Sequence, residues 1–337
     1  MGGKTLSSSA KGTYLRVALV AAAVAVAVAL RVAHDRPHAP PAAATAPVRS
    51  AAAKEQLTRG IELRDQGRGD EALAALQQAA DLAPTDPQPY VEIAKLLASA
   101  EHGKEAIIAI DRALRRAPND SSLWHTAGDL FHDSGDMGAA LKSYRHAVEL
   151  NAKDGEAYKR LGLIEVQTGH PLEALRDLRQ ADSAGMSDFQ TESMLSWLAL
   201  DAGDIQTAGP AVRKALALQP DSPTALLASA RLAMSTNTSS ASLDAAGTQI
   251  DTAMQASPSG PAYLLRGRWN LLRARYPAAI ADLKEALRRD PTARAAHTYL
   301  AQAYAASGQT AQARAEAVTF ERMTDRINTA SAGGPTR

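Results

Sequence analysis

The sequence predicts an all-α fold built from tandem helical hairpins, because small residues recur along it at a fixed interval. Two series of alanines and one series of mixed small residues each repeat every 34 residues. An interval of this length is typical of repeat architectures, in which each unit buries its apolar face against its neighbours. The series are Ala72, Ala106, Ala140, Ala174 and Ala208; Ala79, Ala113, Ala147, Ala181 and Ala215; and Gly60, Ala94, Gly128, Gly162 and Ser196.

Glycines and prolines mark the ends of two helices in each unit. Glycine readily adopts the left-handed conformation that ends a helix, and proline stops a helix. Between these markers apolar residues fall at helical spacing, as at Leu141, Tyr144 and Val148. The first helix is predicted to end near Gly67, Gly135, Gly169, Gly203 and Gly308, and the second near Pro84, Pro118, Pro220, Pro258 and Pro291.

This pattern resembles the tetratricopeptide repeat, a helix–turn–helix unit with an aromatic residue at position 4, glycine at 8 and alanine at 20 and 27. The segment 121–154 matches well, with Trp124, Gly128, Phe131, Ala140, Tyr144 and Ala147. The resemblance implies a right-handed superhelical solenoid of about eight repeats. The expected repeats span 53–86, 87–120, 121–154, 155–188, 189–222, 223–259, 260–293 and 294–327.

Two of the repeats depart from the pattern. Repeat five carries Glu192 where the family usually has an aromatic residue. Repeat six is longer, since the step from Pro220 to Pro258 is 38 residues. The polar run Ser235–Ser242 is predicted to hold the four extra residues as a lengthened turn between its two helices.

Composition excludes several classes of function. The chain has 37 Lys and Arg against 36 Asp and Glu, so no overall basic field favours nucleic acid. It contains no cysteine, which excludes disulfides and thiolate metal sites. Neither the zinc-protease helix motif nor the serine nucleophile elbow occurs in it. We therefore expect no enzyme activity, no cofactor and no metal requirement.

An apolar stretch near the N-terminus favours a membrane anchor. Val17–Leu30 is an uninterrupted apolar run that would span about 21 Å as a helix, and snorkelling of the flanking arginines would extend the span to residues 14–33. A cleaved signal peptide and an ordinary helix remain alternatives. The flanking segments are predicted to be a basic N-terminal segment at 1–13, a Pro/Ala-rich linker at 34–52 and a disordered tail at 328–337.

Charges around the apolar stretch predict its orientation. Lys4, Lys11 and Arg16 precede it, whereas Arg31 and Arg36 follow it beside Asp35. Positive charge favours the cytoplasmic side. We therefore expect a single-pass protein with its repeats on the periplasmic or extracytoplasmic side, or a secreted or periplasmic protein if the signal is cleaved.

The resemblance implies a partner-binding concave groove lined by positions 2, 5, 9, 12 and 13 of each first helix. These positions hold an apolar stripe with charged residues at its edge, which is the mixture that partner surfaces use. The chaperone-tail clamp of some family members is absent from the corresponding positions. The predicted partner-binding residues are Lys95, His125, Asp129, His132, Lys159, Leu163, Val166, Trp197, Leu200, Leu227, Arg231, Met234, Leu264, Arg268 and Leu271.

Two functions follow from these positions. The first is a non-catalytic scaffold that binds a protein or peptide partner, in a membrane-tethered chain of the kind that assists envelope assembly, secretion or export in bacteria. The alternative is a periplasmic receptor for a metal or small ligand, because His125, Asp129 and His132 share one helical face. A solvated polar stripe is the simpler interpretation of that cluster.

Overall fold

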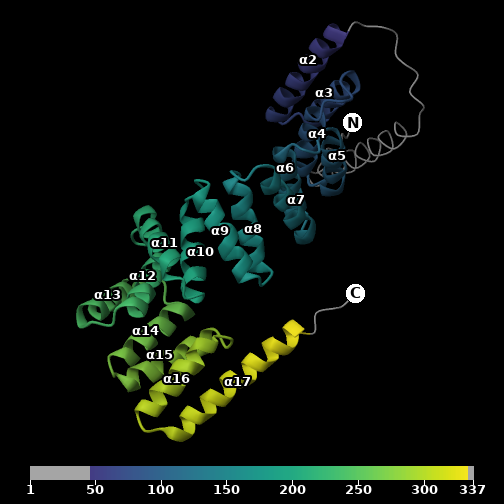
Figure 1. Ribbon diagram of the computed structural model, residues 1–337. Coiled ribbons are helices and arrows are strands. Elements are labelled where there is room, and N and C mark those ends of the chain that lie inside the picture. Colours follow the sequence, from purple (N-terminus) through teal and green to yellow (C-terminus); the bar gives the residue numbers. More distant parts are fainter. Residues whose placement is uncertain (1–45, 333–337) are drawn as a thin grey trace, which may run out of the picture. The chain divides into compact units, whose positions relative to one another are not determined.

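The computed structural model describes residues 46–332, and every regular element in this range is an α-helix (Figure 1). The chain divides into two compact units after Leu150. Unit 1 contains α2 (Ala46–Asp65), α3 (Gly69–Leu82), α4 (Gln88–Ser99), α5 (Gly103–Arg116), α6 (Ser121–Asp133) and α7 (Met137–Leu150). Unit 2 contains α8 (Gly155–Gln167), α9 (Pro171–Ser183), α10 (Phe189–Asp201), α11 (Ile205–Leu218), α12 (Pro223–Thr236), α13 (Ser240–Ala256), α14 (Gly260–Leu272), α15 (Tyr276–Arg289), α16 (Arg294–Ala306) and α17 (Thr310–Ala332).

The helices pair as the 34-residue interval predicts. Each even-numbered helix, which we call helix A of its repeat, packs most extensively on the odd-numbered helix B that follows it. In unit 2, successive A helices also contact one another, from α10 to α12, α14 and α16. The prediction of an all-α fold of stacked hairpins is therefore confirmed, while the right-handed superhelical path stays a prediction.

The terminal helices are longer than predicted. α2 begins at Ala46, inside the segment 34–52 predicted as a linker, and α17 continues to Ala332, past residue 327. Alanine has the highest helix propensity, and Pro47 is the second residue of α2, where its missing N–H breaks no hydrogen bond. The segments 1–13 and 14–33 lie outside the described residues. Within residues 46–332, no helix has the length and apolarity to cross a membrane.

The extra residues of repeat six lengthen its helices, so the predicted long turn is wrong. α12 ends at Thr236 and α13 begins at Ser240, which leaves a connection as short as those of the other hairpins. α13 has 17 residues, compared with 14 in α11 and α15. The physical reason is the N-cap of α13. The Ser239 hydroxyl accepts a hydrogen bond from the Ser242 backbone N–H, and the serines of the polar run therefore begin a helix.

In four of the repeats, helices A and B meet at a glycine at position 8. In repeat three, a Cβ atom placed on Gly128 would lie 2.6 Å from two ring carbons of Tyr144. Tyr144 is fully buried, and its hydroxyl donates a hydrogen bond of 2.6 Å to Asp129. The same contact recurs between Gly60 and Leu76, Gly162 and Leu178, and Gly267 and Leu283. These four positions therefore require glycine, because a side chain of helix B already fills the space above them.

An ion pair with a buried carboxylate replaces the aromatic contact at position 4 in repeat five. In repeat three, Trp124 meets His146 edge to face, with ring centroids 4.4 Å apart. The equivalent residues of repeat five are Glu192 and Lys214, whose charged atoms are 3.2 Å apart. Glu192 is fully buried, and burial raises the pKa of its carboxyl. This ion pair fixes the N-terminal end of α10, which carries the predicted site residue Trp197.

The environment of Glu192 combines acidic, basic and hydroxyl groups. The Ser187 hydroxyl donates a hydrogen bond to the Glu192 carboxylate, and Lys214 also binds Asp182. Burial is the largest single effect and acts to raise the pKa of Asp182, but the hydrogen bonds with Lys214, Glu192 and Ser187 and the charge of Lys214 together outweigh it, so the pKa is lowered. Nearby, Lys159 binds Asp188, which caps α10. These contacts join α8, α9, α10 and α11 into one packed group.

Gly128→Ala should destabilise the protein by about 1–3 kcal/mol, because the added methyl group would displace the buried ring of Tyr144. Thermal and urea unfolding would measure the change. Gly138→Ala in α7 of the same repeat is the control, since its Cβ would meet nothing closer than 3.6 Å. Equal effects of the two substitutions would contradict the assignment of a close contact at position 8.

The buried carboxyl of Glu192 should make stability depend on pH. Because its pKa is raised in the folded state, the folded protein binds this proton more tightly than the unfolded chain. The free energy of unfolding of the wild type, minus that of Glu192→Gln, should therefore rise as the pH falls from 7 toward about 4.3, the pKa of an unfolded glutamate. Urea unfolding across this range would measure it, and a difference that falls with acidification would contradict the assignment.

Candidate interaction face on the A helices of unit 2

The A helices of unit 2 bring the predicted partner-binding positions together. Since α10, α12, α14 and α16 contact one another in sequence, residues at equivalent positions of these helices lie side by side. At these positions side chains link neighbouring A helices, as the contacts of Arg231 and Arg268 show. We call the following residues the helix A face: Trp197, Asp201, Arg231, Ser235, Leu264, Arg268, Leu271 and Leu272.

Trp197 and Arg231 form the contact between α10 and α12. The Arg231 guanidinium lies 5.4 Å from the centroid of the Trp197 ring and forms an ion pair of 2.6 Å with Asp201. Trp197 and Asp201 are one helical turn apart, so a single arginine reaches both. The Trp197 indole is half-buried and packs against the apolar clusters on both sides of it. Trp197 is therefore part core and part surface.

Arg268 forms the contacts of α14 with α12 and α16. Its guanidinium donates hydrogen bonds of 3.3 Å to the Ser235 hydroxyl and 3.3 Å to the Met234 carbonyl. The ring centroid of Tyr299 on α16 lies 5.8 Å away. Leu264 and Leu271 on the same helix are half-buried, and Leu272 is 40% exposed. This part of the face therefore places a cation beside accessible apolar side chains.

Three predicted members of the apolar stripe belong to the core. Leu200, Leu227 and Met234 are 7%, 3% and 2% exposed, and they pack within the apolar clusters of unit 2. Their assignment to the surface is corrected for this reason: the next hairpin covers them. Lys159 is also buried, at 8% exposed, because it binds Asp188. Of the remaining residues on α8, Leu163 is half-buried and Val166 is exposed.

The predicted site residues of unit 1 are engaged in local contacts. Lys95 is exposed and binds the largely buried Glu92 at 3.0 Å. His125 Nε2 lies 3.7 Å from Asp129, whose other carboxylate oxygen accepts the Tyr144 hydroxyl hydrogen bond. His132 faces Asp133 at 3.2 Å. Across the described residues, no three His, Cys, Asp or Glu side chains converge as a metal site, so no geometry supports the metal-receptor alternative.

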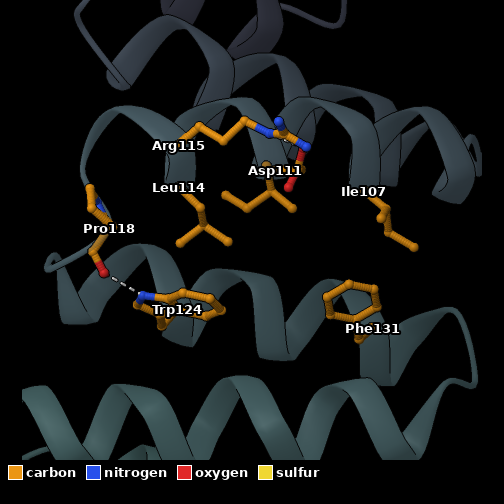
Figure 2. Close-up of a pocket in the computed structure, with 8 residues that line it drawn as sticks. Ile107, Asp111, Leu114, Arg115, Pro118, Trp124 and Phe131 are labelled. Atoms are coloured by element: carbon orange, nitrogen blue, oxygen red, sulfur yellow. Dashed lines mark hydrogen bonds and ion pairs between the residues drawn. The ribbon is translucent and has the colours of Figure 1, made fainter.

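Unit 1 contains an apolar cavity of about 340 Å³ that the sequence did not identify (Figure 2). Figure 2 shows Trp124 and Phe131 of α6 lying opposite Leu114 and Ile107 of α5. The Trp124 indole donates a hydrogen bond of 2.7 Å to the Pro118 carbonyl. Asp111 and Arg115 at the rim bind each other at 2.8 Å, and Ile110 completes the lining. A sequence signal on α5 is its excess of isoleucine, since Ile107 and Ile110 both line the cavity.

Comparison with known proteins gives relatives that share parts of the chain. A human protein, tetratricopeptide repeat protein 8, is 28% identical over 113 residues. The matched stretch is 33% of this chain and 21% of the human protein, so this chain spans about a fifth of that relative. The structure from the functional characterization of Pseudomonas aeruginosa pilF is 16% identical, covers 62% of this chain and 94% of its own, and has a TM-score of 0.49. A tetratricopeptide repeat protein from Parabacteroides merdae is 18% identical, covers 75% and 99%, and has a TM-score of 0.45.

Family models identify the repeat itself. Three models described as tetratricopeptide repeat match residues 63–128, residues 121–154, and residues 193–261 with 273–319. Together these stretches make up more than half of the sequence, and they coincide with the stacked hairpins of both units. The chain belongs to the tetratricopeptide repeat family.

Proposed function

We propose that this chain is a non-catalytic scaffold that binds a protein or peptide partner on the helix A face of unit 2. Tetratricopeptide repeat proteins typically mediate protein–protein interaction and are generally not enzymes, which supports the class of function. The observation that carries the proposal is the juxtaposition on α14 of a cationic side chain, Arg268, with the accessible side chain of Leu272.

Physical chemistry explains why this juxtaposition suits a partner. Binding surfaces draw most of their affinity from a few aromatic, aliphatic and arginine side chains that become fully covered in the complex. The helix A face supplies all three kinds, for example Trp197, Leu272 and Arg268. Because these side chains stand on packed helices, a partner would lose little free energy in ordering them.

We also propose that residues 14–33 anchor the chain in a membrane, with the repeats on the extracytoplasmic side. The support is the apolar run Val17–Leu30 and the excess of basic residues before it. A role in envelope assembly, secretion or export would suit a scaffold in that position.

Leu272→Asp should weaken binding of peptides that the wild-type chain selects. A library of random dodecapeptides would be selected on the full-length protein in mild detergent, and the affinities of recovered peptides would be measured by fluorescence anisotropy. A charge at this position would have to be desolvated under the partner, so we expect a loss of about tenfold or more.

Leu172→Asp is the matched control for that experiment. Leu172 is 70% exposed but lies on α9, a B helix, so its substitution should leave affinity unchanged. Circular dichroism should show both variants folded. If the library yields no binding peptide, or if both variants bind peptides as the wild type does, the helix A face is not the binding surface.

The membrane anchor has its own test. After expression in a bacterium and extraction of membranes with alkaline carbonate, the full chain should remain in the pellet, whereas a chain that begins at Ala46 should be soluble. Mass spectrometry of the full chain should find residues 14–33 intact. A soluble product that has lost these residues would instead establish a cleaved signal.

A further inference from the structure

Arg231 and Arg268 stand at the same position, the ninth, of helix A in consecutive repeats. Each side chain reaches back to the preceding A helix. Arg231 meets a carboxylate there, that of Asp201, at 2.6 Å. Arg268 meets Ser235, which occupies the position equivalent to Asp201, and the contact is a hydrogen bond of 3.3 Å to a neutral hydroxyl. A carboxylate of the preceding repeat therefore compensates the charge of Arg231, whereas the preceding repeat offers Arg268 no carboxylate.

The surroundings of Arg268 reinforce this difference. Among the residues that the structure describes, no carboxylate lies within ion-pair distance of Arg268. The three A helices α12, α14 and α16 contain no aspartate and no glutamate at all. The charge complement of this surface is thus an anion.

The guanidinium of Arg268 is already oriented. Its two terminal nitrogens donate hydrogen bonds, one to the Ser235 hydroxyl and one to the Met234 carbonyl, and the ring centroid of Tyr299 lies 5.8 Å from the guanidinium. An arginine held in this way loses little side-chain entropy when it binds a carboxylate, and a planar fork matches two carboxylate oxygens. The apolar side chains of Leu264, Leu271 and Leu272 are on the same helix.

We propose that Arg268 binds an aspartate or glutamate side chain of the partner, and that the partner residue next to this acid is apolar. The partner's carboxylate takes the place that Asp201 fills for Arg231 in the preceding repeat. This inference rests on the proposed function, because it specifies the chemistry of the peptide that the helix A face accepts.

The peptides selected from the random dodecapeptide library provide the first test. They should be enriched in aspartate and glutamate next to leucine, isoleucine, valine or an aromatic residue. Binding should weaken as salt rises from about 50 to about 500 mM, because salt screens an ion pair at a surface. Peptides that are apolar but not enriched in acid would overturn this inference and leave the proposed function standing. Failure to recover any peptide would overturn both.

Substitutions around Arg268 provide the second test. Arg268→Gln should lower the affinity for the selected acidic peptide by about tenfold or more, the range expected when a hydrogen bond to a charged group is lost. Ser235→Asp should weaken it similarly, because the new carboxylate would occupy Arg268 from within the chain, as Asp201 occupies Arg231. Ser235→Asn, which has the shape of aspartate without its charge, is the matched comparison and should weaken binding much less than Ser235→Asp.

A double-mutant cycle separates recognition from folding. Replacing the acid of the peptide by its amide should cost affinity on the wild type but little more on Arg268→Gln. Ser235→Asp should keep the wild-type melting temperature or exceed it, so its loss of binding cannot come from unfolding. Two outcomes would show that Arg268 does not recognise the partner's carboxylate. In one, the change from acid to amide lowers the affinity of the peptide equally for both proteins. In the other, Ser235→Asp and Ser235→Asn bind the acidic peptide with the same affinity.

Discussion

The close approach of two helices at position 8 is the contact on which the rest of the structure depends. Where this position is glycine, as at Gly128, the large side chain of Tyr144 lies directly above the backbone. Where repeat two has Ala94 there instead, the corresponding residue of helix B is Ile110, and both belong to one apolar cluster. The contact is thus kept with tyrosine, leucine or isoleucine on helix B, while position 8 stays small, as dense packing requires. Hairpins of equal thickness can then stack, and equivalent positions of the A helices align.

Because every hairpin keeps a small residue at position 8, the side chains at other positions can differ in chemistry from repeat to repeat. Repeat five replaces an aromatic contact by an ion pair between the buried Glu192 and the half-buried Lys214. Hydroxyl and carboxylate neighbours satisfy most of the polar atoms of this pair. One carboxylate oxygen of Glu192 has no hydrogen-bond partner in the structure, which is a free-energy cost. Contacts between neighbouring repeats contribute enough to the free energy of folding to offset that cost. The same tolerance allows two equivalent arginines, Arg231 and Arg268, to have different partners.

The site was only partly predictable for a physical reason. The family positions predict that the A helices lie beside one another, and in unit 2 they do contact one another. These positions could not separate residues that the next hairpin covers, such as Leu227 and Met234, from residues that stay accessible, such as Leu272. Depth of burial depends on the size and tilt of side chains from a neighbouring repeat, and no single repeat contains that information.

The sequence by itself determined the period, the order of helices and the glycines that end the A helices, all of which have positive φ. These features are local, because a backbone conformation or a spacing within one helix decides them. Tertiary structure alone decided that Glu101 and Ala274 adopt the same left-handed conformation without being glycine, since the hairpin imposes it. It also decided which arginine charge is compensated. Ser235 and Arg268 are far apart in the chain, and only the stacking of successive A helices brings them into contact.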